Sequence, residues 1–530
     1  MRNWILFTTL ISLLAPTAFG QRLFTEEPPG SMSIGTRWTS PDGDSNFGAV
    51  SFQDTNGLPQ GTVLQPPTDE TIDLRKQLAD LQARLEKIES SRSADSSEEK
   101  EGNADDKTKD LLEKLESGFK DHEEAIQKID STLPNLLYHS HKSPKMQFFG
   151  RTHIDYWSFP EADAGLFPLE GGNPQDRIVF RRLRIGIQGA LNDNMFYKYE
   201  GEFAGGGNVE YRDAYIGFEN LAYLNTVVIG NHKRPYGLDH ANSSRYNIFL
   251  ERPLIVEAFN QDARRLGISS NGYSDDQRWN WRYGVWNQEL TQNRFGYIGD
   301  HYQAEIAGRL AMTPWYDEAS DGRGYAHFAL SGMAGAPDGR TGSTNNQGRY
   351  RTRPEARSSS RWLDTGSIAG ADANSLIGLE TAINVGAFQF VGEYMQATVD
   401  RRTGFGPDVT FDGGYVQAAY FLTGEHMPWD RQTGTLGRIK PFENFYSVRN
   451  CDDCVERGLG AWQVAARYSK ADLSDDNIVG GVGNSLTLGL NWYWNPYARM
   501  QFNYGIGDID RDPTGSGDYQ ICGIRLSVDF

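Results

Sequence analysis

The sequence predicts an all-β protein: an antiparallel transmembrane β-barrel of sixteen or eighteen strands, preceded by a coiled-coil α-helical stalk. Three observations predict the barrel. Its C-terminal segments alternate strictly between apolar and polar residues, each is about ten residues long, and tight turns alternate with long loops between them. A soluble β-sandwich also shows alternation, but it has no reason to place the short turns on one side and the long loops on the other.

The last four predicted strands carry this pattern most clearly. In residues 521–530 the apolar side chains, Cys522 among them, share one face of a strand, and the polar side chains share the other. The same alternation recurs in three preceding segments: 462–469, 486–494 and 499–506. Residues 495–497 form a tight turn, whereas 470–484 and 507–519 are long and rich in Gly and Asp. We therefore expect these strands to cross a membrane with their apolar face outward.

The chain begins with two segments that we do not assign to the barrel. Residues 1–20 combine an early arginine, a short apolar run and small residues at positions 18 and 20, the pattern of a secretory signal peptide cleaved before Gln21. Residues 21–69 are rich in Gly, Pro, Ser and Asp without periodicity, so we expect them to be disordered.

Two segments with helical periodicity follow. Residues 70–90 and 110–137 repeat apolar side chains at the alternating spacing of four and three typical of a coiled coil, and a charged linker at 91–109 separates them. Because helices this short are marginal alone in water, the sequence favours an oligomeric stalk. We expect the stalk to lie in the periplasm, where it can contact the cell wall or a partner. The alternative is a helix packed on another part of its own chain.

Residues 146–530 are predicted to form the barrel. Twelve strands precede the last four, at 147–157, 182–191, 195–203, 209–218, 226–233, 263–270, 279–288, 301–313, 324–334, 375–384, 386–399 and 413–422. With sixteen strands, the tight turns at 192–194 and 495–497 lie on the same side. That count leaves 424–460 as an unusually long connection on the turn side. Either this segment folds into the barrel mouth, or it hides one more hairpin and the barrel has eighteen strands.

Composition excludes several classes of protein. Hydrophobic residues make up 38%, the mean hydropathy is −0.58, and no later segment reaches the roughly 20 apolar residues of a spanning helix. A secreted chain with a net charge of −18 is not expected to bind nucleic acid. The sequence has no nucleophile elbow, zinc-binding helix or phosphate-binding glycine loop, so we expect neither an enzyme nor a cofactor or metal.

Two of the three cysteines are close in the sequence. Cys451 and Cys454 are predicted to form a local disulfide in an oxidising compartment, because no second pair of metal ligands lies near them. Cys522 is expected to be an inert side chain facing lipid.

Basic residues gather in and around residues 231–265. This segment is too apolar at 248–250 and 254–256 to lie free in solvent, so we expect it to pack inside the barrel. Arginine suits bidentate binding of oxyanions, and a channel selects solutes with fixed charges at a constriction. The candidate pore-lining and anion-binding residues are Arg182, Arg184, Lys233, Arg234, Arg245, Arg252, Arg264 and Arg265. The alternative is a solvated loop paired with surface acids, and that interpretation is favoured for a second run, Arg349, Arg351, Arg353, Arg357 and Arg361.

Several segments resemble the phosphate-selective porin O and P family. They are FRRLRIGIQG at 180–189, VEYRDAYIG at 209–217, IGNHKRPYGL at 229–238, RRLG at 264–267, LTGE at 422–425 and GAWQVAARYS at 460–469. The resemblance implies a homotrimeric, sixteen-stranded porin in the outer-membrane lipid. Its arginine-lined lumen, narrowed by an inward loop at 234–262, would pass small anions such as phosphate or pyrophosphate, and phosphate is the solute of the best-known members. Two alternatives remain: a structural outer-membrane anchor and a general non-selective porin, each with a periplasmic stalk.

Overall fold

The computed structural model describes residues 145–205, 208–291, 298–299, 302–340, 345–449 and 455–530. The expected signal peptide, disordered segment, linker and both coiled coils lie outside the described residues, as do Cys451 and Cys454. These features stay predictions.

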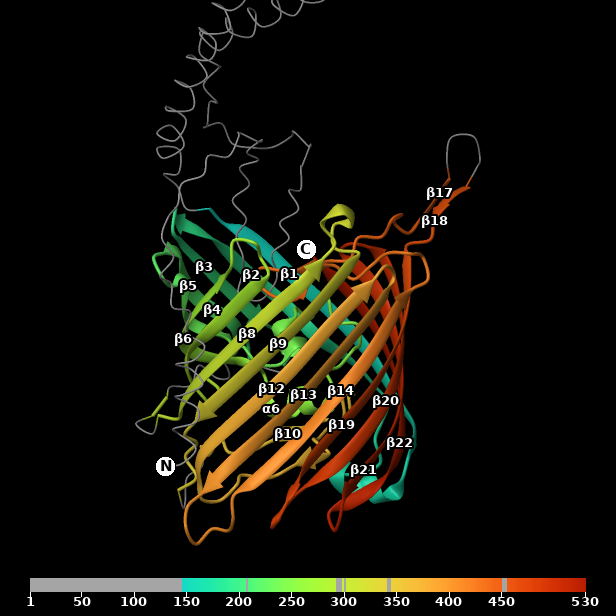
Figure 1. Ribbon diagram of the computed structural model, residues 1–530. Coiled ribbons are helices and arrows are strands. Elements are labelled where there is room, and N and C mark those ends of the chain that lie inside the picture. Colours follow the sequence, from blue (N-terminus) through green and yellow to red (C-terminus); the bar gives the residue numbers. More distant parts are fainter. Residues whose placement is uncertain (1–144, 206–207, 292–297, 300–301, 341–344, 450–454) are drawn as a thin grey trace, which may run out of the picture. The chain divides into compact units, whose positions relative to one another are not determined.

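Sixteen strands form one closed antiparallel barrel (Figure 1). They are β1 (Gln147–Ala162), β2 (Arg177–Asn192), β3 (Met195–Glu202), β4 (Glu210–Leu221), β5 (Asn225–Lys233), β6 (Arg264–Tyr273), β7 (Trp279–Asn287), β8 (Ala304–Tyr316), β9 (Gly324–Gly335), β12 (Ala371–Val385), β13 (Phe388–Arg401), β14 (Val409–Phe421), β19 (Ala461–Asp475), β20 (Ile478–Asn495), β21 (Ala498–Arg511) and β22 (Gly515–Asp529). Each strand pairs with its neighbour in sequence order, and β1 closes the barrel against β22.

The connections hold short elements. The helical ones are η1 (Ala164–Leu166), α4 (Phe167–Glu170), α5 (Leu238–Ala241), α6 (Leu254–Phe259) and η2 (Glu318–Ser320). Three two-stranded pairs complete the set: β10 (Arg351–Thr352) with β11 (Leu363–Asp364), β15 (Trp429–Asp430) with β16 (Thr435–Leu436), and β17 (Tyr446–Arg449) with β18 (Val455–Gly458). Among the described residues, no helix is long and apolar enough to cross a membrane.

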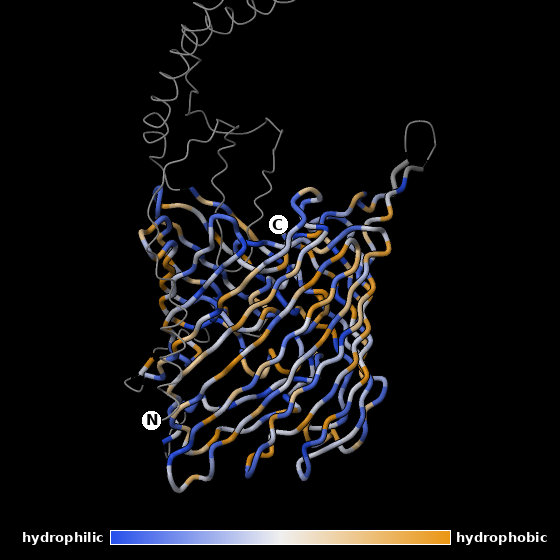
Figure 2. Tube along the Cα trace, in the orientation of Figure 1, coloured by the Kyte–Doolittle hydropathy of each residue, from blue (hydrophilic) through white to orange (hydrophobic). Residues whose placement is uncertain are grey.

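The alternation of side chains becomes an outer apolar face and an inner polar face. In β22, Val528 is exposed, whereas Arg525, Ser527 and Asp529 are buried inside the barrel. Figure 2 shows hydrophobic and hydrophilic residues alternating along the strands. A strand places successive side chains on opposite faces, so the sequence pattern alone produces this division.

The long segment between β14 and β19 resolves the strand count. The sixteen-strand prediction is confirmed and the eighteen-strand alternative is wrong, because β15 to β18 form two separate hairpins outside the barrel sheet. The first hairpin enters the barrel: the backbone N–H of Leu436 donates to Asn242 Oδ1 at 2.9 Å. The second projects beyond the barrel at the end where the chain terminates (Figure 1). We call that end, which holds Gln147 and Asp529, the terminal rim, and the opposite end the loop rim.

Residues 234–263, between β5 and β6, form an inward loop that crosses the barrel interior. Its backbone is fixed to the far wall by polar side chains. The N–H groups of Leu238 and Asp239 donate to the Glu393 carboxylate at 2.7 and 2.9 Å, and that of Leu254 donates to Ser469 Oγ at 3.1 Å. Backbone groups that leave water need such partners, so these lumenal side chains hold the loop inside the barrel.

The same wall accommodates the apolar side chains of the inward loop. Ile255 and Val256 have no exposed surface, and burying such a side chain contributes about 1.5–3 kcal/mol. A side chain at Gly413 would begin 2.9 Å from Ile255 Cδ1, and one at Gly489 would begin 3.2 Å from a ring atom of Phe249. These two glycines leave the space that the loop fills.

Candidate functional site

A cationic hollow of about 560 Å³, a volume that includes adjoining solvent, lies between the inward loop and the wall built by β1, β2, β4, β5 and β6. Eight basic side chains line it: Arg151, Arg181, Arg182, Arg184, Arg212, Lys233, Arg252 and Arg264. Only two carboxylates, Glu257 and Asp262, belong to the same lining. The surface offered to a solute is therefore strongly basic.

A β-bulge concentrates the basic side chains on β2. The pairing of β1 with β2 shifts between His153 and Ile154, so that Arg181 has no partner of its own. An extra residue in one strand changes which side chains face inward. Arg181, Arg182 and Arg184 all line the hollow as a result, although strict alternation would turn Arg181 outward.

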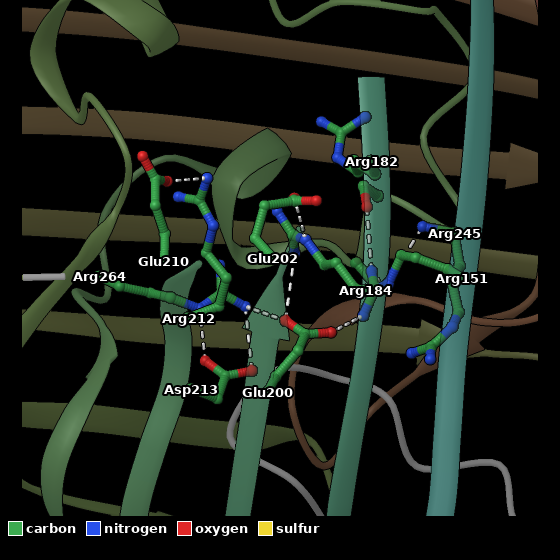
Figure 3. A network of polar contacts seen from close by, with 12 residues as sticks. Arg151, Arg182, Arg184, Glu200, Glu202, Glu210, Arg212, Asp213, Arg245 and Arg264 are labelled. Carbon is green, nitrogen blue, oxygen red and sulfur yellow. Dashed lines mark hydrogen bonds and ion pairs between the residues drawn. The ribbon is translucent and has the colours of Figure 1, made fainter. Parts of the chain in front are cut away.

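Carboxylates lie behind the arginines and hold them in place. Glu200 Oε1 accepts from Arg151 at 2.8 Å, and its Oε2 lies 3.2 Å from Arg184. Asp213 Oδ2 accepts from Arg264 Nη2 at 3.0 Å. Figure 3 shows Glu200 and Asp213 among these guanidinium groups. The side chains of both acids are fully buried and do not line the hollow, so an entering anion meets guanidinium groups first.

Arg182 differs from its neighbours. Its Nη1 contacts His153 Nδ1 at 3.1 Å, and no carboxylate lies within 4 Å of it in the described part of the chain. The side chain is nevertheless only 3% exposed, and it stands apart from the ion pairs in Figure 3. A buried cation without a carboxylate partner is costly, which makes Arg182 the clearest candidate to meet an anion.

The inward loop supplies the other side of the hollow. Ser243 Oγ and Ser244 Oγ accept from Arg151 at 3.3 and 3.0 Å, and Arg252 pairs with Asp239 at 3.2 Å. Lys233 donates to the carbonyls of Ala241 and Asn242 at 3.2 and 3.3 Å, which fixes the end of α5.

His240 and Glu257 are neighbours on the same side, with His240 Nε2 and Glu257 Oε2 3.5 Å apart. Burial, followed by the charges of Arg252 and Lys233, lowers the pKa of His240 well below its usual value. The imidazole is therefore neutral at pH 7, and this contact is not an ion pair.

A second set of arginines, in the loop between β9 and β12, does not line the hollow but lies close enough to Arg181 and Asp262 to interact with their charges. The charge of Arg181, followed by burial, lowers the pKa of Arg357. Burial, followed by the charges of Arg357 and Arg361, lowers the pKa of Arg353 to about 10. Burial raises the pKa of Asp262, but the charges of Arg212, Arg265 and Arg361 outweigh it and hold that pKa below its usual value. The arginines of β2, β4 and β6 and of the loop between β9 and β12 therefore all contribute to the positive potential in this part of the barrel.

The structure thus separates the predicted site residues into two groups. Arg182, Arg184, Lys233, Arg252 and Arg264 line the cationic hollow. The other three do not: Arg234 pairs with Glu305 at 2.9 Å, Arg245 with Asp529 at 3.0 Å, and Arg265 donates to the Gln288 carbonyl at 2.6 Å.

The sequence interpretation omitted three of the eight basic side chains that line the hollow: Arg151, Arg181 and Arg212. The alternation of the first strand signals Arg151, but no local pattern signals the bulge at Arg181. The interpretation of residues 349–361 as a solvated loop paired with acids holds for Arg349, which is exposed and pairs with Asp364. It is wrong for Arg351, Arg353, Arg357 and Arg361, which are half-buried, and the adjacent Trp362 has no exposed surface. Trp362 was the sequence feature that could have indicated that this segment is buried.

Within the described residues, no group of three His, Cys, Asp or Glu side chains is placed to hold a metal ion.

Comparison with known proteins gives two relatives. An uncharacterised protein of Caulobacter vibrioides is 27% identical over 369 residues, which cover 66% of this chain and 68% of the relative. Porin O of Pseudomonas aeruginosa is 24% identical over 406 residues, which cover 70% of this chain and 84% of Porin O.

Among solved structures, OmpT of Vibrio cholerae in its trimer form aligns with a TM-score of 0.44 and 11% identity, over 73% of this chain and all of OmpT. An anion-selective porin from Comamonas acidovorans aligns with a TM-score of 0.43 and 13% identity, also over 73% of this chain and all of that porin. The family described as "Phosphate-selective porin O and P" matches residues 148–530. The chain belongs to the phosphate-selective porin O and P family and is a channel of the outer membrane.

Proposed function

We propose that this porin lets small anions, with phosphate or pyrophosphate preferred, diffuse passively across the outer membrane through the cationic hollow, and that it does so as a homotrimer. The anion would pass between the inward loop and the wall of β1, β2 and β4. It would exchange part of its hydration for guanidinium and hydroxyl donors. No substrate is transformed and no energy is consumed.

One observation carries the proposal: guanidinium groups face the hollow while the carboxylates that hold them lie behind. Coulomb energy falls with distance and with the dielectric of the intervening medium. An anion in contact with Arg182 and Arg252 is therefore attracted by nearby cations more strongly than it is repelled by Glu200 and Asp213. The acids contribute rigidity, since each bound guanidinium is already oriented before the anion arrives.

The test is single-channel conductance of the purified protein in a planar bilayer, in potassium chloride, with phosphate titrated in. We expect an anion-selective current that low phosphate concentrations reduce, because phosphate would reside longer than chloride among forked donors. Arg402→Gln, at an exposed ion pair on the loop rim, is the matched control and should leave this block unchanged.

Two other outcomes would replace the proposal. A steady current that leans toward cations and ignores phosphate would leave a general non-selective porin. A folded barrel with no conductance would favour a structural anchor, whose loss of residues 70–136 should then weaken the cell envelope. Chemical cross-linking of the protein in membranes tests the trimer, since a dominant species other than three chains would contradict it.

A further inference from the structure

A second hollow, separate from the cationic hollow, lies on the terminal-rim side of the inward loop. Its volume is about 340 Å³, open solvent included. We call it the terminal hollow. The residues that matter here are Arg245, Arg438, Arg499, Tyr493, Tyr497 and Asp529. They come from the inward loop, from the segment between β14 and β19, and from β20 to β22, so the hollow exists only when all these parts are assembled.

Three guanidinium groups face one carboxylate in the terminal hollow. Asp529 Oδ2 forms an ion pair with Arg245, whose Nε lies 3.0 Å away, and accepts a hydrogen bond from Arg438 Nη2. The Arg438 guanidinium lies 4.6 Å from the ring centroid of Tyr497, so its plane is held against an aromatic face. One carboxylate cannot neutralise three arginines, and the hollow keeps an excess of positive charge.

Two of these arginines have donors without an acceptor. Arg499 is only 5% exposed; its Nη2 donates to the Ser244 carbonyl at 3.3 Å, while its Nη1 has no hydrogen-bond partner among the described residues. Nε of Arg438 is also buried without a partner in this part of the chain. A buried charged donor left unsatisfied is costly, and an oxyanion in the terminal hollow would accept from such donors.

The two hollows meet at residues 243–245 of the inward loop. Ser243 and Ser244 line the cationic hollow, and the next residue, Arg245, lines the terminal hollow. Arg499 donates to the carbonyl of Ser244 from the terminal side, and Arg151 donates to its hydroxyl from the other. A single turn of the loop, residues 243–245, therefore separates the two hollows.

We infer that the terminal hollow is a second binding site for small oxyanions such as phosphate, in series with the first. This inference rests on the proposed function, because it takes the cationic hollow to be an anion pathway. Conduction needs sites that bind well enough to admit an ion and weakly enough to release it, and two adjacent occupied sites assist release by mutual repulsion. Asp529 would tune the terminal site by competing with the anion for Arg245 and Arg438.

The experiment uses the full-length protein in planar bilayers, inserted in one orientation that an epitope tag in the 402–408 loop reports. Phosphate is added to one side at a time while the chloride current is recorded. Arg499→Gln removes a charged donor, so we expect it to raise the phosphate concentration for half-block from the terminal side about tenfold. Asp529→Asn should lower the same concentration, because it removes the competing carboxylate.

Three further variants test the loop-side site, control for nonspecific effects and provide a substitute for Arg499→Gln. Arg252→Gln should weaken block from the loop side, and Arg402→Gln should change neither side. Arg438→Lys keeps the charge but loses the forked donors, so it should give a smaller increase than Arg499→Gln and serves if that variant does not fold.

If the folded terminal-hollow variants leave terminal-side block unchanged while Arg252→Gln weakens it, the channel has one site and this inference is wrong. If the wild-type protein shows no phosphate block from either side, the proposed function itself fails.

Discussion

The barrel interior holds two sets of buried arginines, and they differ in where their carboxylate partners lie. In the cationic hollow Glu200 and Asp213 stand behind the arginines, and the lining holds eight basic side chains against two acidic ones, Glu257 and Asp262. Elsewhere in the barrel interior, arginines pair with buried carboxylates and donate to the carbonyls of segments that enter the barrel. We call three of these the bracing arginines: Arg309, Arg467 and Arg525.

Each bracing arginine pairs with a buried carboxylate and also contacts a segment that enters the barrel. Arg467 Nη2 pairs with Glu355 at 2.6 Å and donates to the Glu251 carbonyl at 2.9 Å, so it fixes two loops together. Arg525 pairs with Asp155 at 2.7 Å and also contacts Glu251. Arg309 holds the β15–β16 hairpin by donating to the Gly434 carbonyl at 2.8 Å.

The comparison shows that a buried arginine in a barrel is not by itself a sign of a solute site. Both sets are buried and both have acidic neighbours. What differs is whether the guanidinium groups line a hollow that a solute can enter. The bracing arginines should therefore matter for stability, and the arginines of the cationic hollow for selectivity.

The largest expected effect concerns stability. Arg467→Ala leaves the carboxylate of Glu355 buried without its main partner, and breaking a buried pair in this way costs about 3–5 kcal/mol of the free energy of unfolding. Urea unfolding of the refolded barrel in detergent micelles measures this loss. Arg402→Ala, which breaks an exposed pair with Asp372, is the control and should cost less than about 1 kcal/mol. Equal losses would remove the distinction between bracing and surface pairs.

A smaller effect is expected for the arginines of the cationic hollow, and it concerns the block of the current by phosphate rather than stability. Replacing Arg182 and Arg252 together with Gln should raise the phosphate concentration for half-block roughly tenfold, equivalent to about 1.4 kcal/mol of lost attraction. The free energy of unfolding should fall less than in Arg467→Ala, because Arg182 has no ion pair to lose and Arg252 loses only its pair with Asp239. A variant as destabilised as Arg467→Ala would show that Arg182 or Arg252 is a bracing residue too.

The smallest effect concerns Glu257, one of the two acids that line the hollow. Burial, followed by the charge of Asp262, raises the pKa of the Glu257 carboxyl above its usual value. As the pH falls through this raised pKa, the carboxylate takes up a proton, the hollow loses a negative charge, and anion preference should increase. Glu257→Gln should show the higher preference already at pH 7 and should lack this step on acidification. A pH profile identical to that of the wild type would assign the step to another group.

Much of the fold follows from the alternation of apolar and polar residues. Predicted strands at 226–233, 279–288 and 324–334 differ from β5, β7 and β9 by one residue at an end. Tight turns and alternation can be read from short stretches of sequence. Consecutive strands that share one apolar face and are joined by such turns are readily accommodated by a closed antiparallel barrel. The sequence left the role of 424–460 open, because only three-dimensional contacts, such as Arg309 with Gly434, show that its first hairpin enters the barrel.

The candidate site could be predicted only in part. Arg182, Arg184 and Arg252 could be chosen from alternation and from the apolar character of the inward loop. Arg181 could not, because a bulge reverses its direction without any local signal. Nor could the sequence separate Arg252, which lines the hollow, from Arg245, which lies seven residues earlier and lines the terminal hollow. Whether a residue of the inward loop lines one hollow or the other depends on which part of the barrel wall its turn of the loop contacts.

The most direct test of the account is the reversal potential of single channels under a potassium chloride gradient, measured for the wild type, for Arg182→Gln with Arg252→Gln, and for Arg402→Gln. The account predicts an anion-selective potential in the wild type and in Arg402→Gln, and a shift toward the cation side in the double variant. An unchanged potential in a folded, conducting double variant would contradict the claim that the cationic hollow selects anions.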